Sequence, residues 1–321
     1  MEFLKKYVFL KLCAAPPPSP TSTAALGAGR IAAEASFATL LAFSVFLMGI
    51  LMADGFPASA SKRGLGANDD ITITNFGGNG SQIVWQYNWD SNTTNKQPFL
   101  EYVPMLWSIP GDPDVWNGHA NTWISAGSSH LLAFNEPENE GQSNIDPTTA
   151  ADAYRQYMQP FAGKAKLGAP AVSNDGYSWM SQFLGNCTDC TIDFVPIHWY
   201  NPVFLIDDFK SFTSEMCGLA GNRSVWVTEF MPLGNDSVAI EQFMQEAIDW
   251  LDEQDCVERY AYFGTADGYT SLLHNGGPPL SPLGKTYAFT PYGGGDHMSI
   301  PSTGGGFGDA DGVLGSDECG G

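Results

Sequence analysis

Basic residues are scarce in this sequence. The chain of 321 residues has 14 lysines and arginines against 35 aspartates and glutamates, which gives a formal net charge of -21. A field of this sign repels phosphate backbones and anionic lipid, so nucleic acid and acidic membrane surfaces are excluded as partners. A neutral polymer such as carbohydrate is indifferent to the field. The 9 Trp, 12 Tyr and 20 Phe offer flat apolar faces for sugar rings, although most of them are expected in the core.

The sequence also lacks the patterns that hold metals and nucleotides. One Cys-x-x-Cys pair could be half of a zinc site or a redox motif, but no second pair and no histidines at ligand spacing accompany it. We therefore expect no metal and no cofactor. In an oxidising compartment the body cysteines suggest two disulfides, with three pairings open. These cysteines are Cys187, Cys190, Cys217 and Cys256.

Residues 1–60 are predicted to be a targeting leader. Basic residues precede an uncharged apolar run from Ala35 to Ala53, which is long enough to span a bilayer. Ala58-Ser59-Ala60 follows and is a pattern that signal peptidase accepts. The leader is therefore either a signal peptide or a signal anchor. The first predicts a secreted or cell-wall protein, and the second predicts a membrane-anchored protein with its catalytic domain outside the cell.

Three further features concern processing. Lys62-Arg63 is either a dibasic processing site or the beginning of the first strand. Residues 291–321 are rich in Gly, Ser and Asp and are predicted to be a disordered tail. Five glycosylation sequons agree with secretion, so we expect a secreted glycoprotein, as a monomer. The sequons begin at Asn79, Asn92, Asn186, Asn222 and Asn235.

Between leader and tail, short apolar runs alternate with amphipathic stretches. Runs such as VWVT and FVPIHWY are almost continuously apolar, which is typical of strands buried on both faces of a parallel sheet. Helices are predicted between them, most clearly at 148–158 and 237–254. The predicted strands are Arg63–Ala67, Ile83–Tyr87, Tyr102–Leu106, Leu131–Phe134, Lys166–Ala169, Phe194–His198, Val225–Thr228 and Tyr260–Phe263.

Eight strands alternating with helices predict an α/β fold, a single (β/α)8 TIM barrel over residues 61–290. A doubly wound open sheet is the alternative. No glycine-rich phosphate loop follows any predicted strand, which disfavours it.

Two glutamates are the candidate catalytic residues. Glu136 follows the fourth predicted strand and Glu229 follows the seventh. In a parallel barrel both strand ends lie at the rim that carries active sites, on opposite sides of its mouth. Two carboxylates about 5 to 5.5 Å apart suit a retaining glycosidase, in which one attacks the anomeric carbon and the other protonates the leaving oxygen. Glu138 and Glu140 compete with Glu136, which we prefer because Asn135 precedes it.

These motifs resemble glycoside hydrolase family 128, within the clan of retaining (β/α)8 glycosidases. The resemblance runs in order from about residue 62 to 290. It implies a retaining endo-hydrolase of β-1,3-glucan, with Glu229 as nucleophile and Glu136 as acid/base. The stretches that carry it are Lys62-Arg63-Gly64-Leu65, Trp85-Gln86-Tyr87-Asn88-Trp89, Pro104-Met105-Leu106-Trp107, Phe134-Asn135-Glu136-Pro137, Ile197-His198-Trp199-Tyr200 and Trp226-Val227-Thr228-Glu229-Phe230.

The resemblance also implies roles for residues around the pair. Asn135 would position the 2-hydroxyl of the sugar, and His198 and Tyr200 would orient the nucleophile. Tyr262 stands where related enzymes often present a tryptophan to the sugar, which puts that platform in doubt. The residues implied to line the cleft are Asn88, Trp89, Trp107 and Tyr262.

Two alternative functions are considered. A non-catalytic β-glucan-binding cell-wall protein would keep the cleft without the chemistry, but both glutamates are present. A transglycosylase of the same fold would use the same residues to transfer sugar to another sugar, and the sequence does not separate it from a hydrolase.

Overall fold

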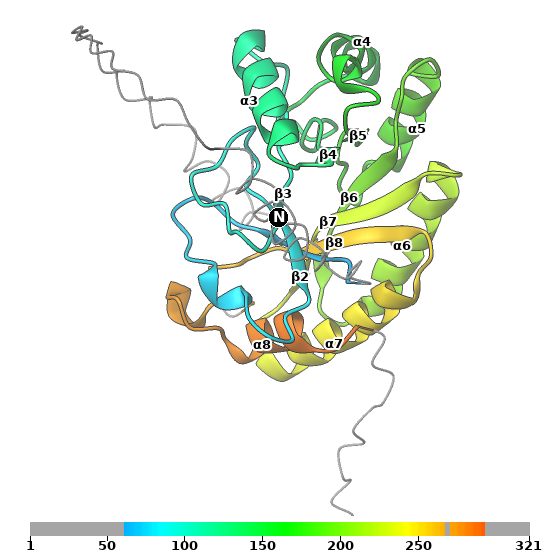
Figure 1. Ribbon diagram of the computed structural model, residues 1–321. Coiled ribbons are helices and arrows are strands. Elements are labelled where there is room, and N and C mark those ends of the chain that lie inside the picture. Colours follow the sequence, from blue (N-terminus) through cyan, green and yellow to red (C-terminus); the bar gives the residue numbers. More distant parts are fainter. Residues whose placement is uncertain (1–60, 267–269, 293–321) are drawn as a thin grey trace, which may run out of the picture.

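The computed structural model describes residues 61–266 and 270–292. The predicted leader and all but the first two residues of the predicted tail lie outside these ranges. Within them, no helix is both long and apolar enough to cross a membrane. Strands lie at the centre of the molecule and helices surround them (Figure 1).

The strands pair in parallel and form two sheets. The larger sheet has the order β3-β2-β1-β8-β7-β6, and the smaller one pairs β4 with β5. The strands are β1 (Arg63–Gly66), β2 (Ile83–Tyr87), β3 (Glu101–Tyr102), β4 (His130–Leu131), β5 (Lys166–Leu167), β6 (Phe194–Pro202), β7 (Ser224–Leu233) and β8 (Val257–Tyr262).

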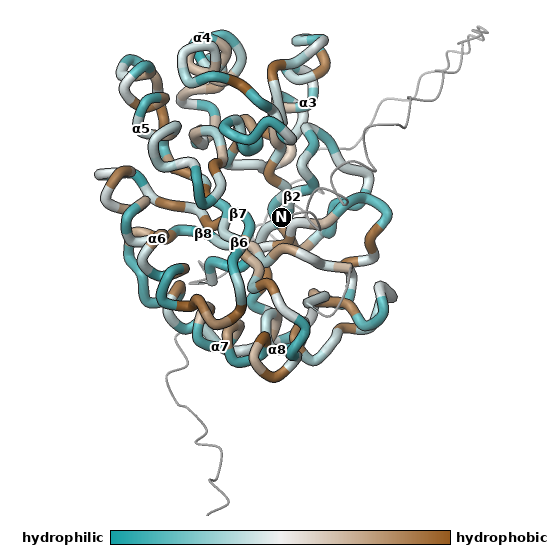
Figure 2. The backbone as a smooth tube through the Cα atoms, turned by 180° about the vertical axis from the view of Figure 1, so that it is seen from behind, coloured by the Kyte–Doolittle hydropathy of each residue, from teal (hydrophilic) through white to brown (hydrophobic). Residues whose placement is uncertain are grey.

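Helices follow most of the strands. The α-helices are α3 (Pro113–Ser125), α4 (Pro147–Tyr157), α5 (Tyr177–Asn186), α6 (Ile206–Ala220), α7 (Ser237–Glu253) and α8 (Pro282–Phe289), and the 3-10 helices are η1 (Thr74–Phe76), η2 (Gln159–Phe161) and η3 (His274–Gly276). Hydrophobic and hydrophilic residues alternate along these elements (Figure 2). The predicted α/β class with parallel strands is confirmed, and each predicted strand overlaps an observed one.

β3 and β5 are shorter than predicted because prolines follow them. Pro104 and Pro170 have no backbone N–H and cannot donate to a ladder. Isolated parallel bridges extend the pairing, at Met105–Leu132 between the segments of β3 and β4 and at Gly168–Phe194 between those of β5 and β6. The two borders between the sheets are therefore bridged, although neither carries a continuous ladder.

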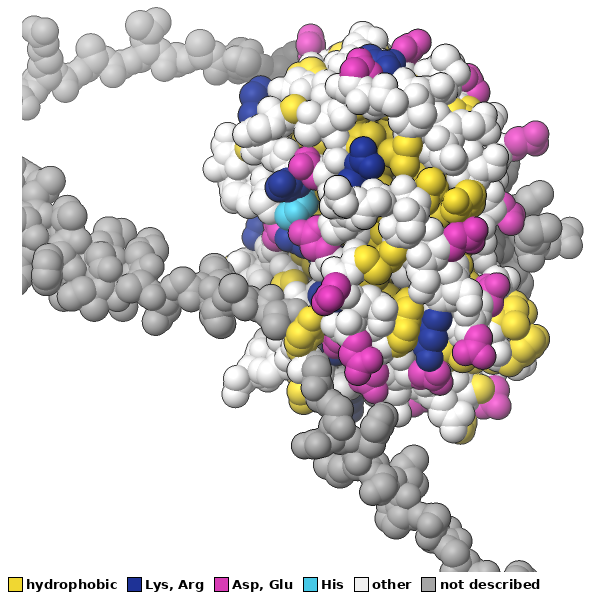
Figure 3. Space-filling view, turned by 90° about the vertical axis from the view of Figure 1, so that its right-hand side faces the viewer, with side chains coloured by type: hydrophobic (Ala, Val, Ile, Leu, Met, Phe, Trp, Pro, Cys, Tyr) yellow, Lys and Arg dark blue, Asp and Glu magenta, His cyan; other side chains and the backbone are white. Residues whose placement is uncertain are grey.

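Two apolar clusters lie on the two sides of the strands. The larger one includes the buried faces of the helices, among them Ile240, Phe243 and Met244 of α7. The smaller one is formed by residues of the strands and of the segments that follow them, and Trp85 and Trp226 are its largest members. At the surface, acidic side chains are spread widely and basic ones are few (Figure 3).

The cysteines form two disulfides, as predicted, and the structure resolves their pairing. Cys187 pairs with Cys190 at the end of α5, and Cys217 of α6 pairs with Cys256 just before β8. The Cys-x-x-Cys pair is therefore not part of a zinc site in this structure.

The beginning of β1 anchors the ends of two helices. Arg63 is completely buried, and its guanidinium group lies 2.8 Å from Asp252 and donates to the carbonyl groups of Tyr287 and Thr290. Lys62 donates to three carbonyl groups at the end of α7, where a cation stabilises the helix. Arg63 therefore begins the first strand and Lys62, which is partly buried, directly precedes it, which favours the strand over the dibasic processing site.

A charged cluster links β3 to β8 across the sheet. One carboxyl oxygen of Glu101 lies 2.6 Å from Arg259 Nη2, and the other lies 3.3 Å from His130 Nδ1. Burial raises the pKa of Glu101, but the hydrogen bond with His130 and the charge of Arg259 outweigh burial and lower the pKa to about 2.

Glu101→Gln is expected to reduce the acid sensitivity of the fold. The pKa of Glu101 in the folded state lies below its ordinary value of 4.5. Its carboxylate therefore stabilises the fold above about pH 4.5, and this contribution is lost as the pH falls from there towards 2. The variant should unfold more easily at neutral pH, and its free energy of unfolding should change less over the acid range. Urea denaturation at a series of pH values measures both, and identical pH slopes for the two proteins would contradict the assignment.

Candidate active site

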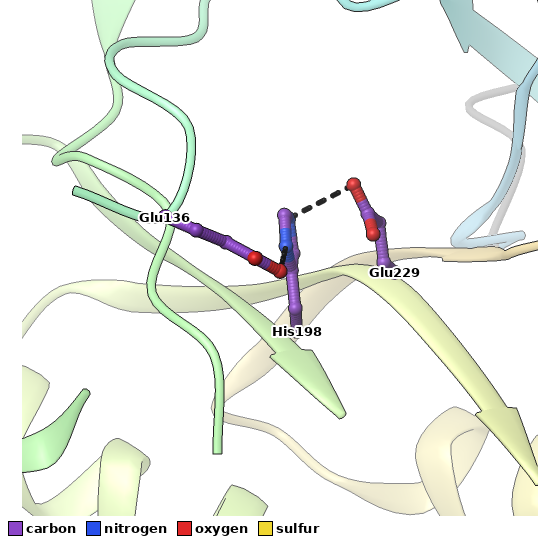
Figure 4. Close-up of side chains that lie close together, drawn as sticks. All are labelled: Glu136, His198 and Glu229. Carbon is purple, nitrogen blue, oxygen red and sulfur yellow. Dashed lines mark hydrogen bonds and ion pairs between the residues drawn. The ribbon is translucent and has the colours of Figure 1, made fainter. Parts of the chain in front are cut away.

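Three elements bring the predicted catalytic residues together. Glu229 lies within β7 and His198 within β6, and a register shift after Ile197 pairs these two residues directly. Glu136 lies in the segment that follows β4. The side chain of His198 lies between the two carboxyl groups (Figure 4).

The three side chains form one buried cluster. One carboxyl oxygen of each glutamate and one ring nitrogen of His198 all lie within 4.8 Å of one another. His198 Nδ1 is 2.8 Å from Glu136 Oε1, and His198 Nε2 is 3.5 Å from Glu229 Oε1. His198 is completely buried, and the two glutamates are 7% and 5% exposed. The structure thus brings the two predicted carboxylates together from residues 93 positions apart in the chain (229 − 136).

Glu229 accepts hydrogen bonds at both carboxyl oxygens. Trp89 Nε1 donates to Oε1 at 2.7 Å, and the hydroxyl group of Tyr200 donates to Oε2. Donors aimed at a carboxylate favour its ionised form and fix its orientation. The predicted contact of Tyr200 with Glu229 is therefore present.

His198 contacts Glu136 more closely than Glu229. Its other nitrogen, Nε2, lies 3.0 Å from the hydroxyl oxygen of Thr228. The backbone carbonyl of Thr228 in turn accepts a hydrogen bond from the hydroxyl group of Tyr87. Neither Thr228 nor Tyr87 was predicted as a site residue, although Thr228 directly precedes the predicted nucleophile.

The charges of the cluster alter one another. Burial raises the pKa of Glu229, the charge of Glu136 raises it further, and His198, Tyr200 and Trp89 oppose these effects only in part. Burial lowers the pKa of His198, but Glu229 and Glu136 more than offset burial, so the pKa of His198 lies above its ordinary value of 6.5. The site therefore favours a cationic imidazole beside the carboxyl groups.

Two residues of the site have strained backbones. Glu136 has φ of 41° and Trp89 has φ of 61°, in the left-handed region that residues other than glycine seldom adopt. Each such conformation costs on the order of 1–3 kcal/mol and persists only where its surroundings hold it. The backbone N–H of Glu136 donates to the carbonyl of Ala171 at 2.7 Å, which ties the strained residue to the segment after β5.

Asn135 is buried beside Glu136 and is held by its own loop. Its Nδ2 donates to Gln142 Oε1 at 3.1 Å, and its Oδ1 is buried with no hydrogen-bond partner in the protein. An unpartnered buried amide oxygen is costly unless a ligand or water binds it. Asn135 therefore has one free acceptor.

Asn88 does not line an open cleft. It is 5% exposed, and its amide group is used by neighbouring residues. Nδ2 donates to Asp69 and to the carbonyl of Asn92, and Oδ1 accepts from Tyr102. The prediction of a substrate contact is corrected: Asn88 fixes the loop that carries Trp89.

An open groove lies beside the catalytic cluster. It has a volume of about 320 Å³, and its walls come from the segments after β2 and β3. Trp89 and Trp107 both line it, as does Val115, which is 49% exposed. Two of the predicted cleft residues are thus brought to one open surface.

The predicted platform residue on β8 faces away from the site. Tyr262 is completely buried, and its ring packs against Phe230 and Tyr287 among the residues that contact the helices. The next residue, Phe263, lies instead beside Trp89 and Tyr200, with ring centroids 5.8 and 5.4 Å away. The prediction of Tyr262 is wrong because successive residues of a strand point to opposite faces. Because the run from Tyr260 to Phe263 is apolar throughout, no polar alternation in the sequence could have identified Phe263.

Glu136, His198 and Glu229 are also residue types that bind metal ions. Both ring nitrogens of His198 already have partners, Glu136 at Nδ1 and Thr228 at Nε2. A metal would have to displace one of these contacts. The cluster fits a hydrogen-bonded set of acid, base and imidazole better than a metal centre.

Comparison with known proteins identifies relatives of the chain. The chain is 32% identical to Alkali-sensitive linkage protein 1 of Schizosaccharomyces pombe over 222 residues, which are 64% of this chain and 40% of that protein. The chain therefore spans less than half the length of this curated relative.

Solved structures are also similar to the chain. A curdlan-specific exo-β-1,3-glucanase of family 128, subgroup III, from Blastomyces gilchristii is 41% identical, with a TM-score of 0.66 over 72% of this chain and 99% of that one. An endo-β-1,3-glucanase of family 128, subgroup I, from Amycolatopsis mediterranei, solved in complex with laminaritriose, is 26% identical, with a TM-score of 0.60 over 71% and 98%. Residues 64–287 match the family described as glycosyl hydrolase catalytic core. The chain therefore belongs to the glycosyl hydrolase catalytic-core family, and its resemblance to glycoside hydrolase family 128 is confirmed.

Proposed function

We propose that this protein hydrolyses β-1,3-glucan with retention of configuration, using Glu229 as nucleophile and Glu136 as acid/base. The observation that carries the proposal is the buried cluster in which both carboxyl groups approach one imidazole, with the three nearest atoms within 4.8 Å. This separation suits direct attack by one carboxylate, whereas inverting enzymes hold their carboxyl groups about 6.5–9.5 Å apart to admit a water molecule.

The reaction proceeds in two displacements. A carboxyl oxygen of Glu229 bonds to the anomeric carbon while the bond from that carbon to the leaving oxygen breaks, and Glu136 gives its proton to that oxygen. Glu136 then takes a proton from water, the water oxygen bonds to the anomeric carbon, and the carboxylate of Glu229 leaves. His198 compensates the charge of both glutamates, and the 2.8 Å contact allows it to exchange a proton with Glu136.

The roles of the two glutamates follow from their partners. Glu229 accepts hydrogen bonds from Trp89 and Tyr200, which keep it ionised and oriented for attack. Within residues 61–266 and 270–292, the side chain of Glu136 has an N–H donor only from Asn139, at 3.4 Å, besides its contact with His198. The free amide oxygen of Asn135 can accept a hydrogen bond from the 2-hydroxyl of the sugar. One hydrogen of the Asn135 amide nitrogen is already donated to Gln142.

The proposed substrate is a neutral β-1,3-glucan chain. The endo-β-1,3-glucanase with bound laminaritriose and the curdlan-specific exo-enzyme are both similar to this chain. The groove lined by Trp89 and Trp107 offers aromatic faces to a sugar. We predicted endo action from the sequence, while the relative with 41% identity is an exo-enzyme. We therefore propose β-1,3-glucan hydrolysis by either mode and separate the modes by their products.

We also propose that the strands close into a (β/α)8 barrel. The bridges at Met105–Leu132 and Gly168–Phe194 support closure, because they link the borders of the two sheets. Secretion to the cell wall, with or without membrane anchorage by the leader, is proposed from the sequence alone. N-terminal sequencing of the mature protein checks whether residues 1–60 are removed.

Replacing either carboxylate should abolish most activity without unfolding the protein. Glu229→Gln and Glu136→Gln are each expected to lower kcat on linear β-1,3-glucan about a thousandfold or more, since the electrostatic and proton-transfer contributions are lost. Reducing-sugar release and chromatography of products measure the effect. Glu140→Gln, an exposed change in the same loop as Glu136, is the matched control.

The products of the parent protein decide between the remaining alternatives. Mixed oligosaccharides at early times indicate endo action, glucose or one short product indicates exo action, and products longer than the substrate indicate transfer. Binding of glucan without any product would contradict the enzymatic proposal and favour a wall-binding protein. Activity of Glu229→Gln within tenfold of the parent would remove that residue as nucleophile.

Tyr200→Phe should move the acid limb of the pH profile upwards. Glu229 must be ionised to attack, and burial already raises its pKa, so kcat/KM falls as the pH drops through that raised value. Loss of the Tyr200 hydroxyl removes a donor that favours the ionised form, which raises the pKa of Glu229 further. Profiles of kcat/KM on β-1,3-glucan from pH 3 to 9 measure the limb. A shift to lower pH would contradict the assignment.

Substitutions of the neighbours Phe263 and Tyr262 test which of the two side chains is directed at the site. Phe263→Ala removes a ring that contacts Trp89 and Tyr200, and should raise KM for glucan about tenfold through loss of aromatic packing at the site. Tyr262→Phe removes only a buried hydroxyl group and should leave kcat and KM within about twofold of the parent. Initial-rate kinetics on soluble oligosaccharides measure both variants. The reverse order of effects would restore Tyr262 as the platform.

A further inference from the structure

The loop after β4 holds another buried carboxyl group, which the proposed chemistry does not use. Glu138 lies two residues beyond Glu136. Its Oε1 accepts the backbone N–H of Ser173 at 2.6 Å, and its Oε2 is buried with no hydrogen-bond partner among the residues that the structure describes. Burial raises the pKa of Glu138, and the hydrogen bonds from Ser173 oppose this only in part. Glu140, two residues further along, is exposed.

Three hydrogen bonds attach this loop to the segment after β5. The N–H of Ala171 donates to the carbonyl of Phe134 at 2.8 Å, and the N–H of Glu136 donates to the carbonyl of Ala171 at 2.7 Å. The third is the bond from Ser173 to Glu138. The first two are backbone contacts that any residue can make, whereas the third requires an acceptor on the side chain of residue 138.

Glu136 makes the second bond through its own N–H and lies two residues before Glu138, which makes the third. Its φ is 41°, in the left-handed region. Such a conformation relaxes unless the chain on both sides is held. Before Glu136, the chain continues into β4 through Asn135, which is bridged to Ala171. After Glu136, the side chain of Glu138 is the contact that reaches the segment after β5.

We propose that Glu138 is a positioning residue, whose carboxyl group binds Ser173 and thereby holds Glu136 with its own carboxyl group directed at His198 and Glu229. This inference rests on the proposed function of Glu136 as proton donor. Glu138 makes no hydrogen bond to the three members of the catalytic cluster. It therefore acts through the backbone of the loop.

Substitutions at position 138 separate this role from an effect of charge. Glu138→Gln keeps an oxygen for Ser173 and resembles the protonated acid, but removes the charge. Glu138→Asp keeps the charge and is one methylene group too short to reach Ser173 in the same backbone position. Glu138→Ala removes both. Glu140→Ala, Glu140→Gln and Glu140→Asp are the matched controls on the exposed side of the same loop.

The readout is the dependence of kcat/KM on the leaving group, because this constant reports the first displacement. On β-1,3-gluco-oligosaccharide, Glu138→Ala and Glu138→Asp should lower kcat/KM about 10- to 100-fold, the scale expected for a misplaced catalytic group. On dinitrophenyl β-laminaribioside, whose leaving group needs no proton, the loss should stay below about threefold. Glu138→Gln should stay within about threefold of the parent on both substrates.

Several outcomes would overturn the proposal. One is full activity of Glu138→Ala on the oligosaccharide. Another is an equal loss on both substrates, which indicates a general structural role. A third is loss of activity in Glu138→Gln with activity retained in Glu138→Asp. Together with a shifted pH profile, this result would assign the effect to the charge of Glu138. Should Glu138→Ala fail to fold, Glu138→Asp and Glu138→Gln still give opposite expectations.

Amide hydrogen exchange tests the contact without relying on catalysis. The N–H of Ser173 should be protected in the parent and in Glu138→Gln, and should exchange faster in Glu138→Asp and Glu138→Ala, with global stability matched by denaturation. Unchanged protection in all variants would overturn the contact. A parent that hydrolyses neither substrate would instead contradict the proposed function, and the exchange result would still decide the contact.

Discussion

The imidazole ring of His198 allows two carboxyl groups to be buried side by side. Bringing Glu136 and Glu229 out of water and close together is unfavourable on two counts, burial and like charge. His198 lies 2.8 Å from one and 3.5 Å from the other, and its pKa is raised by both. The register shift in β6 that pairs His198 with Glu229 is therefore a condition for the site. Thr228 contributes by holding the second ring nitrogen.

The two glutamates are supported in different ways. Glu229 lies inside a long strand, where it pairs directly with His198 of β6, while the ladder to β8 is interrupted by a register shift between Val227 and Phe230. Glu136 lies in an irregular segment, next to strands that are only two residues long. Its backbone is strained and depends on contacts with the segment after β5. A nucleophile that must meet one carbon atom is placed on the rigid element, while the group that exchanges protons is placed on the loop.

Site residues that lie at the ends of strands could be predicted from the sequence. Site residues whose role depends on which face of a strand their side chains occupy could not. Each glutamate follows an apolar run, so its position at the end of a buried strand could be predicted. Along β8 the run Tyr260 to Phe263 is apolar throughout, so no polar alternation shows which side chains face the site. Asn88 was misassigned because composition does not reveal that its amide group is already used by neighbours. The pairing of His198 with Glu229 depends on the register shift, which no local pattern indicates.

In the proposed mechanism, catalysis and substrate selection reside in different parts of this fold. The cluster around His198 is built from β6, β7 and the segment after β4, whereas the open groove is built from the segments after β2 and β3. Trp89 is the link, because its indole nitrogen binds Glu229 while its ring borders the groove. Loops can change in length without disturbing the core, so the groove can be shortened or extended while the cluster stays intact. Trp89 has less of this freedom for two reasons. Its backbone is strained, and a substitution there would remove a hydrogen-bond donor from the proposed nucleophile.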